Sequence, residues 1–147
     1  MVIAAGGGGI PVVRRGVLLQ GSEAVIDKDR CSALLATELT AEVLLFSTGV
    51  THVYQNFGTK DEKPLFRLSW EEAHDFLEEG EFAAGSMGPK VEAALTFLEA
   101  GGQRAIITAP EYMAAALRGA AGTEISPPLR DSRETIAIQP RPVWSME

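Results

Sequence analysis

The chain has 147 residues, which is enough for one domain with its own hydrophobic core. Hydrophobic residues make up 46% of it and charged residues 22%, as in ordinary soluble globular proteins. The net charge of −7 disfavours broad binding to nucleic acid or to an anionic membrane, and no apolar run is long enough to span a bilayer. The single cysteine, Cys31, permits no internal disulfide, which is typical of a cytoplasmic protein.

Apolar runs and helical periods alternate along the chain, which predicts an α/β domain with a mainly parallel sheet over residues 1–125. We expect a buried strand at 2–5, whose abrupt start suggests a preceding segment, then a glycine loop at 6–11 and a short strand at 24–26. A helix is expected at 29–39. The apolar residues within 42–47 predict a strand buried on both faces.

The second half of the domain has clearer boundary signals. Residues 48–63 are expected to be mostly loop, interrupted by a short apolar piece at 53–54. Ser69 and Glu72 form a capping box for a helix at 69–79, which ends at Gly80. A regular helix is expected at 89–100, a buried strand at 104–108 and a last helix at 110–118, which ends at Gly119. Residues 126–147 contain four prolines and no sustained period, so we expect a loosely ordered tail.

A glycine run follows the first expected strand. Residues 6–11 read GGGGIP, and such glycines let backbone N–H groups approach an anion closely. No Gly-Lys-Ser/Thr follows, so this is not a Walker loop, and no helix follows as in a dinucleotide-binding turn. A phosphate-binding loop and a flexible turn both remain open.

Two lysines stand where helices are expected to begin. Lys28 lies between Asp27 and Asp29, and Asp29 could simply cap the helix. Lys90 follows Pro89, which suits a first helical position, and the helix start should offer unpaired N–H groups. A cation at a helix N-terminus opposes the macrodipole. Two such placements in one small domain therefore favour a site for a phosphoryl group.

The remaining residues that could carry chemistry favour structural interpretations. His52 and His74 share no metal-ligand spacing with each other or with Cys31, so structural or solvated roles are expected and no protein metal site. Trp70 is expected to pack at the start of its helix.

These motifs, in this order, resemble carbamate kinase, a member of the amino-acid-kinase superfamily. The segments that carry the resemblance are 2–13 (VIAAGGGGIPVV), 23–29 (EAVIDKD), 32–36 (SALLA), 53–58 (VYQNFG), 82–94 (FAAGSMGPKVEAA) and 104–107 (RAII). They extend over most of residues 2–124, and the string around Lys90 is the most specific of them.

The resemblance implies the nucleotide-binding C-terminal half of a three-layer α/β sandwich. It implies phosphoryl transfer between ATP and carbamate, or the reverse formation of ATP from carbamoyl phosphate and ADP, with magnesium accompanying the nucleotide. By matching motif, Lys28 would contact the transferring phosphoryl group, Asp29 would orient the lysines and Lys90 would neutralise nucleotide phosphates. Residues implied to border the reacting groups are Gly7, Gly8 and Gly9, and those implied for the nucleotide pocket are Thr48, Val50, Tyr54, Met87 and Gly88.

Two departures from the family pattern matter. The family has acidic residues after the strand at 42–47, whereas residues 48–52 read TGVTH, which bears on nucleotide affinity and metal handling. The family's N-terminal half has no counterpart in these 147 residues. We therefore expect a weak or inactive enzyme when the chain is alone, an exposed apolar sheet edge, and a homo-oligomer or a partner that supplies the missing half. A non-catalytic nucleotide-binding or regulatory subunit is the alternative, and an amino-acid kinase acting on another acceptor is a third hypothesis.

Overall fold

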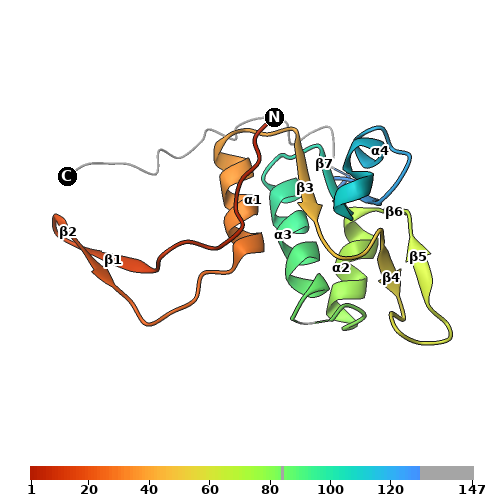
Figure 1. Cartoon of the computed structure of the whole chain (residues 1–147), viewed down its shortest axis with the longest axis horizontal. Coiled ribbons are helices and arrows are strands. Elements are labelled where there is room, and N and C mark those ends of the chain that lie inside the picture. The colour runs from red at the N-terminus through yellow and green to blue at the C-terminus, as the bar shows by residue number, and fades with distance from the viewer. Residues whose placement is uncertain (84, 130–147) are drawn as a thin grey trace.

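The computed structural model describes residues 1–83 and 85–129. Residues 1–27 form an arm that projects from the rest of the molecule, and the helices and the main sheet make up the body (Figure 1). Most of the predicted tail, 130–147, lies outside the described residues.

The arm differs from its prediction. Residues 2–5 and 24–26 form no strand, and Val2 and Val25 are 69% and 96% exposed. The arm instead contains an antiparallel hairpin, β1 (Val12–Arg15) paired with β2 (Leu18–Gly21), whose residues are all exposed. The predicted strands are wrong because a strand needs a neighbouring strand to pair with. None of the described segments pairs with residues 2–5 or 24–26.

The main sheet has the strand order β3-β7-β8-β6. Strands β3 (Val43–Ser47) and β7 (Arg104–Thr108) run parallel, as do β6 (Arg67–Leu68) and β8 (Thr123–Ile125), whereas β7 and β8 run antiparallel. This confirms the predicted α/β fold and the strands at 42–47 and 104–108. Strands β6 and β8 were not predicted, because three or fewer residues give no readable alternation.

Strands β7 and β3 differ in how deeply they are buried. Every residue of β7 from Ala105 to Thr108 is buried, whereas in β3 only Leu44 and Phe46 are. The prediction of burial on both faces is therefore wrong for β3, because β3 lies at the edge of the sheet.

Helix α3 (Met87–Glu99) is the centre of the helical layer and lies between α1 (Lys28–Glu38) and α2 (Trp70–Glu78) (Figure 1). Its buried residues meet Ala105 and Ile107 of β7 in one core cluster. Residue Ile106 is also buried but stands outside that cluster, as expected for the residue that faces the other side of the strand. A short 3₁₀ turn (Pro110–Tyr112) and α4 (Met113–Leu117) follow β7 and cover it there.

The local boundary signals are confirmed. Ser69 and Glu72 form the capping box of α2, and Gly80 and Gly119 adopt the positive φ angles that end their helices. Residues 48–63, expected as loop with an apolar piece, contain strand β4 (Val53–Gln55), which pairs antiparallel with β5 (Lys63–Leu65). None of the described helices has the length and apolar character needed to cross a membrane.

Candidate functional site

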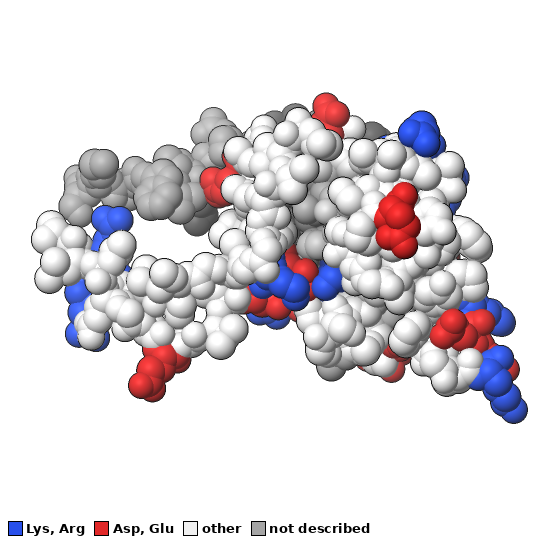
Figure 2. Space-filling view, in the orientation of Figure 1, with Lys and Arg blue, Asp and Glu red and all other residues white. Residues whose placement is uncertain are grey.

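The first turns of α1 and α3 bring three predicted site residues together. Lys90 Nζ lies 3.2 Å from Asp29 Oδ2, and Lys28 Nζ lies 3.3 Å from the same oxygen. Lys90 Nζ also donates to the carbonyl oxygen of Ser86 at 3.4 Å. Figure 2 shows basic and acidic atoms side by side in the middle of the molecule, where the arm meets the body. We call Lys28, Asp29 and Lys90 the lysine cluster.

Burial differs sharply within the lysine cluster. The side chains of Asp29 and Lys90 are only 6% and 9% exposed, whereas that of Lys28 is 48% exposed. A buried ammonium requires a counter-charge, and Asp29 supplies it for Lys90. The ammonium of Lys28 remains accessible to an anion from solvent. The arrangement thus holds one fixed cation and one accessible cation on a single carboxylate.

Asp27, not Asp29, caps helix α1. Its carboxylate accepts hydrogen bonds from the backbone N–H groups of Asp29 and Arg30, both at 2.9 Å. The hydrogen bond from Arg30 is the main cause that holds the pKa of Asp27 below its usual value, with the bond from Asp29 and the charges of Lys28 and Arg30 adding to it. The structural interpretation of Asp29 as a cap is therefore wrong, and its carboxylate is left to the two lysines.

The start of α3 differs from its prediction. The helix begins at Met87 rather than Pro89, because the carbonyl oxygen of Ala83 accepts hydrogen bonds from the N–H groups of Ser86, Met87 and Gly88. Since Pro89 has no N–H, the expected unpaired donors of this first turn are not available. Positive charge at the site therefore comes from the lysine side chains. Gly88 is buried, and a Cβ there would stand 3.4 Å from the Ala83 oxygen.

The glycine loop lies beside the entrance to α1. A Cβ added to Gly8 would come 1.7 Å from the carbonyl oxygen of Ile26, two residues before Lys28, so only glycine allows this approach. Gly7 and Gly9 face open space, and Gly9 has a φ of 97°. Of the three predicted glycines, Gly8 is the one held against the residues that lead into the site.

Topology places the predicted nucleotide residues at the same edge of the sheet. Each of α1 and α3 leads through a short turn into the N-terminal end of β3 or β7, so both helices begin near the carboxyl ends of these parallel strands (Figure 1). Thr48 and Val50 follow β3 at that edge, Tyr54 lies on β4, and all three are partly exposed. Open α/β sheets bind ligands at this edge. Met87 and Gly88 reach it from the start of α3.

An ion pair beside the lysine cluster was not predicted. Arg30 Nη2 donates to Glu92 Oε1 at 2.7 Å and ties the first turn of α1 to the second turn of α3. This hydrogen bond and the Glu92 charge raise the pKa of Arg30. The two residues are 62 positions apart, so no local pattern announces the pair.

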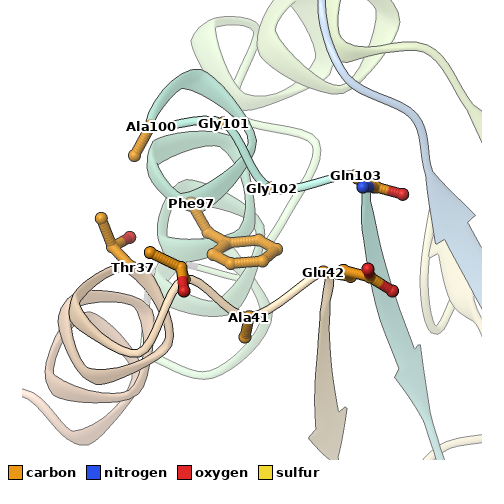
Figure 3. A pocket seen from close by; sticks show the side chains of 9 residues that line it. Thr37, Ala41, Glu42, Phe97, Ala100, Gly101, Gly102 and Gln103 are labelled. Carbon is orange, nitrogen blue, oxygen red and sulfur yellow. The ribbon is translucent and has the colours of Figure 1, made fainter. Parts of the chain in front are cut away.

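Two cavities lie away from the lysine cluster, and no predicted site residue lines either of them. One of about 160 Å³ lies between the ends of α1 and α3, lined by residues that include Thr37, Phe97 and Gly102 (Figure 3). Helix C-termini carry partial negative charge, so this cavity disfavours phosphate. The other, of about 600 Å³, lies between α4 and the base of the β4–β5 hairpin, where His52 packs edge-on against Phe66. Burial lowers the pKa of His52 there.

The other singled-out residues have packing roles. Trp70 is partly buried against the core and stacks on His74, with ring centroids 4.9 Å apart. Within residues 1–83 and 85–129, no group of three or more histidine, cysteine, aspartate or glutamate side chains could hold a metal ion.

Comparison with known proteins finds relatives of this chain in the amino acid kinase family. The amino acid kinase family model matches residues 1–109. The chain is 56% identical to a carbamate kinase of Halobacterium salinarum over 126 residues, which is 86% of this chain and 41% of that protein. It is 49% identical to a carbamate kinase of Thermoplasma acidophilum over 123 residues, 84% of this chain and 40% of that one.

The fold agrees with a solved structure. Carbamate kinase from Giardia lamblia bound to AMP-PNP superimposes with a TM-score of 0.78 at 40% identity, covering 82% of this chain and 42% of that one. The chain thus spans about two fifths of the length of the relatives it matches.

Proposed function

The chain belongs to the amino acid kinase family, and we propose that it forms the nucleotide-binding C-terminal half of a carbamate kinase. The reaction proposed is phosphoryl transfer between ATP and carbamate, or its reverse. The observation that carries the proposal is Asp29 Oδ2 shared by Lys28 and Lys90 at 3.3 and 3.2 Å, in a chain 56% identical to a carbamate kinase over 126 residues.

The chemistry of phosphoryl transfer explains why such a cluster is useful. Charge on the transferring group is spread over its oxygens, and catalysis depends on fixed cations and on alignment. Lys28, with its accessible ammonium, would contact the transferring phosphoryl group, and Lys90 would neutralise phosphate charge on the nucleotide. Asp29 would hold both ammonium groups in place, because its carboxylate is their shared partner.

The remaining site residues have supporting roles in the proposal. Gly7, Gly8 and Gly9 would border the reacting groups, with Gly8 kept beside the entrance to α1. The nucleotide itself would lie across the carboxyl edge of β3, against Thr48, Val50, Tyr54, Met87 and Gly88.

Magnesium is implied by the family, but the residues described do not form a site for it. Asp29 is committed to two lysines, and the loop after β3, residues 48–52, contains no acidic residue. Phosphate oxygens would therefore supply its ligands, and we assign no side chain to it.

Several features suit a half-site rather than a whole enzyme. The side chain of Lys28 is 48% exposed, and Val17, Leu18 and Leu19 of the arm are at least 65% exposed. We propose that a partner chain supplying the remaining length of the relatives, or a second copy, covers these surfaces. Turnover by the chain alone would be weak, because one wall that aligns the substrates is missing.

The test is ADP binding by calorimetry, with magnesium present, to the native chain, to Lys90→Ala and to Lys28→Ala. Lys60→Ala, on the exposed turn between β4 and β5, is the matched control. Lys90→Ala should weaken ADP binding about tenfold, as expected for the loss of one charged contact. Lys28→Ala should bind ADP like the native chain and like Lys60→Ala, because the proposed partner of Lys28 is the transferring phosphoryl group, which ADP lacks. Equal binding by all four proteins would contradict the assignment.

The alternative, a non-catalytic regulatory subunit, is supported by the loop without acidic residues. Coupled ATP formation from carbamoyl phosphate and ADP separates the two. Turnover that appears when the missing half is supplied favours the split enzyme, and nucleotide binding without turnover in that mixture favours the regulatory subunit.

A further inference from the structure

Two buried threonines hold the segment 48–66, which contains the β4–β5 hairpin, to the end of the main sheet. Thr108 is the last residue of β7 and Thr123 the first of β8, and both are 0% exposed. Neither takes part in the lysine cluster. Buried hydroxyl groups are costly unless they are bonded, so their partners show what they do.

Thr123 joins both strands of the β4–β5 hairpin at its base. Its hydroxyl accepts a hydrogen bond from the backbone N–H of Val53 at 2.8 Å and donates one to the carbonyl oxygen of Leu65. Val53 and Leu65 are register partners in the hairpin. A hydroxyl can donate and accept at once, which neither a valine nor an alanine could do.

Thr108 holds the start of the same segment. Its hydroxyl donates to the carbonyl oxygen of Thr51 at 3.2 Å, and its own carbonyl accepts from the N–H of Thr48 at 2.9 Å. Gly122 permits this arrangement, since a Cβ there would come 2.9 Å from the Cβ of Thr108. The two threonines therefore fix the segment at 48–53 and again at 65.

We propose that Thr123, supported by Thr108, is a positioning residue for segment 48–66. The hairpin has only three residues in each strand, and within the described residues it shares no strand pairing with the main sheet. The burial of Val53 in the core and the backbone hydrogen bond from the Glu124 N–H to the Phe66 carbonyl oxygen help to hold it, and the two hydroxyls add the side-chain bonds that fix its base. By holding Thr51 and Val53, which adjoin Val50 and Tyr54, the two hydroxyls set the geometry of the nucleotide surface, while the backbone carbonyl of Thr108 holds Thr48. This last consequence rests on the function proposed above.

Hydrogen exchange followed by mass spectrometry, on the full chain, tests the positioning without any ligand. The variants are Thr123→Val, which keeps the shape and removes the hydroxyl, Thr123→Ser, which keeps the hydroxyl, and Thr108→Val. Thr96→Val is the control, because the Thr96 hydroxyl bonds only a carbonyl of its own helix, that of Glu92, on an exposed face. ADP calorimetry accompanies each variant.

Thr123→Val should accelerate exchange within 48–66 about tenfold while α1 and α3 keep the native rates, and should weaken ADP binding by a similar factor. Thr123→Ser should restore the native exchange rate within 48–66 and the native ADP affinity, and Thr96→Val should match the native chain in both. Unchanged exchange in 48–66 would overturn the proposal, as would equal acceleration everywhere, which marks a merely structural role.

Two further outcomes, a variant that does not fold and a native chain that binds no ADP, can be told apart. If Thr123→Val does not fold, Thr108→Val decides, with faster exchange confined to 48–66 supporting the proposal and native exchange overturning it. If exchange responds as expected but the native chain binds no ADP, the positioning stands and the proposed nucleotide function is the part that fails.

Discussion

Lys90 Nζ lies 3.2 Å from Asp29 Oδ2 although 61 positions separate the two residues. The contact joins the first turn of α3 to that of α1, and Lys28 approaches the same oxygen from the neighbouring position. Because Asp29 and Lys90 are both buried, this pair should affect both the stability of the fold and the function of the proposed site.

Asp29→Asn should lower the free energy of unfolding by about 3 kcal/mol, because it leaves the buried Lys90 ammonium without its counter-charge. Lys90→Met should lower the free energy of unfolding by less than Asp29→Asn does, because Lys28 still pairs with Asp29 and the methionine fills the space of the lysine. Urea unfolding of both single variants and of the double variant measures the coupling. If the two single changes in the free energy of unfolding add up to that of the double variant, the ion pair itself contributes nothing to stability.

Gly8→Ala should disturb the site with little change in the midpoint of thermal unfolding. The added Cβ would fall 1.7 Å from the Ile26 carbonyl oxygen, which is backbone and cannot move without moving the entrance to α1. The arm around it contributes little to the core, so ADP affinity is the measurement that should fall. Gly6→Ala, which meets no atom within 4 Å, is the control and should bind as the native chain does.

Asp27→Ala should destabilise the chain by about 1 kcal/mol through loss of the α1 cap, whereas Asp27→Asn should be nearly neutral at pH 7. The folded chain holds the pKa of Asp27 below its ordinary 3.8. The stabilisation is therefore complete above pH 3.8 and is lost as the pH falls through the lower folded value. Denaturation at a series of acid pH values should show this loss in the native chain and not in Asp27→Asn.

His52 predicts a second pH dependence. Burial lowers its pKa below 6.5, so the unfolded chain takes up a proton first as the pH falls. Stability should be full above pH 6.5 and decline below it, toward the folded pKa. Arg67 and Glu124 line the same cavity, and Glu124 is paired with Arg104. Between pH 7 and 5, the midpoint of thermal unfolding should fall less steeply with pH in His52→Phe than in the native chain. An equal fall in both proteins would show that another group causes the pH dependence.

Local patterns predicted the elements whose causes lie within a few residues. The capping box of Ser69 and Glu72, the terminating glycines Gly80 and Gly119, and the apolar run of β7 each placed an element correctly. Lys28 and Lys90 were also singled out as lysines at expected helix starts, whereas the role of Asp29 beside them was implied by the family resemblance.

Contacts between distant segments decided the rest. An apolar run such as residues 2–5 becomes a strand only if a neighbour pairs with it, and a strand as short as β8 exists only because β7 and β6 flank it. Two local details were also predicted wrongly, because a neighbouring acceptor took the N–H groups: the carboxylate of Asp27 caps α1, and the carbonyl of Ala83 starts α3 early.

The sequence by itself determined the α/β class and most helix boundaries to within two residues, because these follow from propensity, period and capping over short distances. Only the tertiary structure decided that Asp29 is shared by two lysines and that Thr123 bonds Val53 and Leu65. Apart from the adjacent Lys28, the partners in these contacts are 58 to 70 positions apart, and helix packing and strand register bring them together without a local signature.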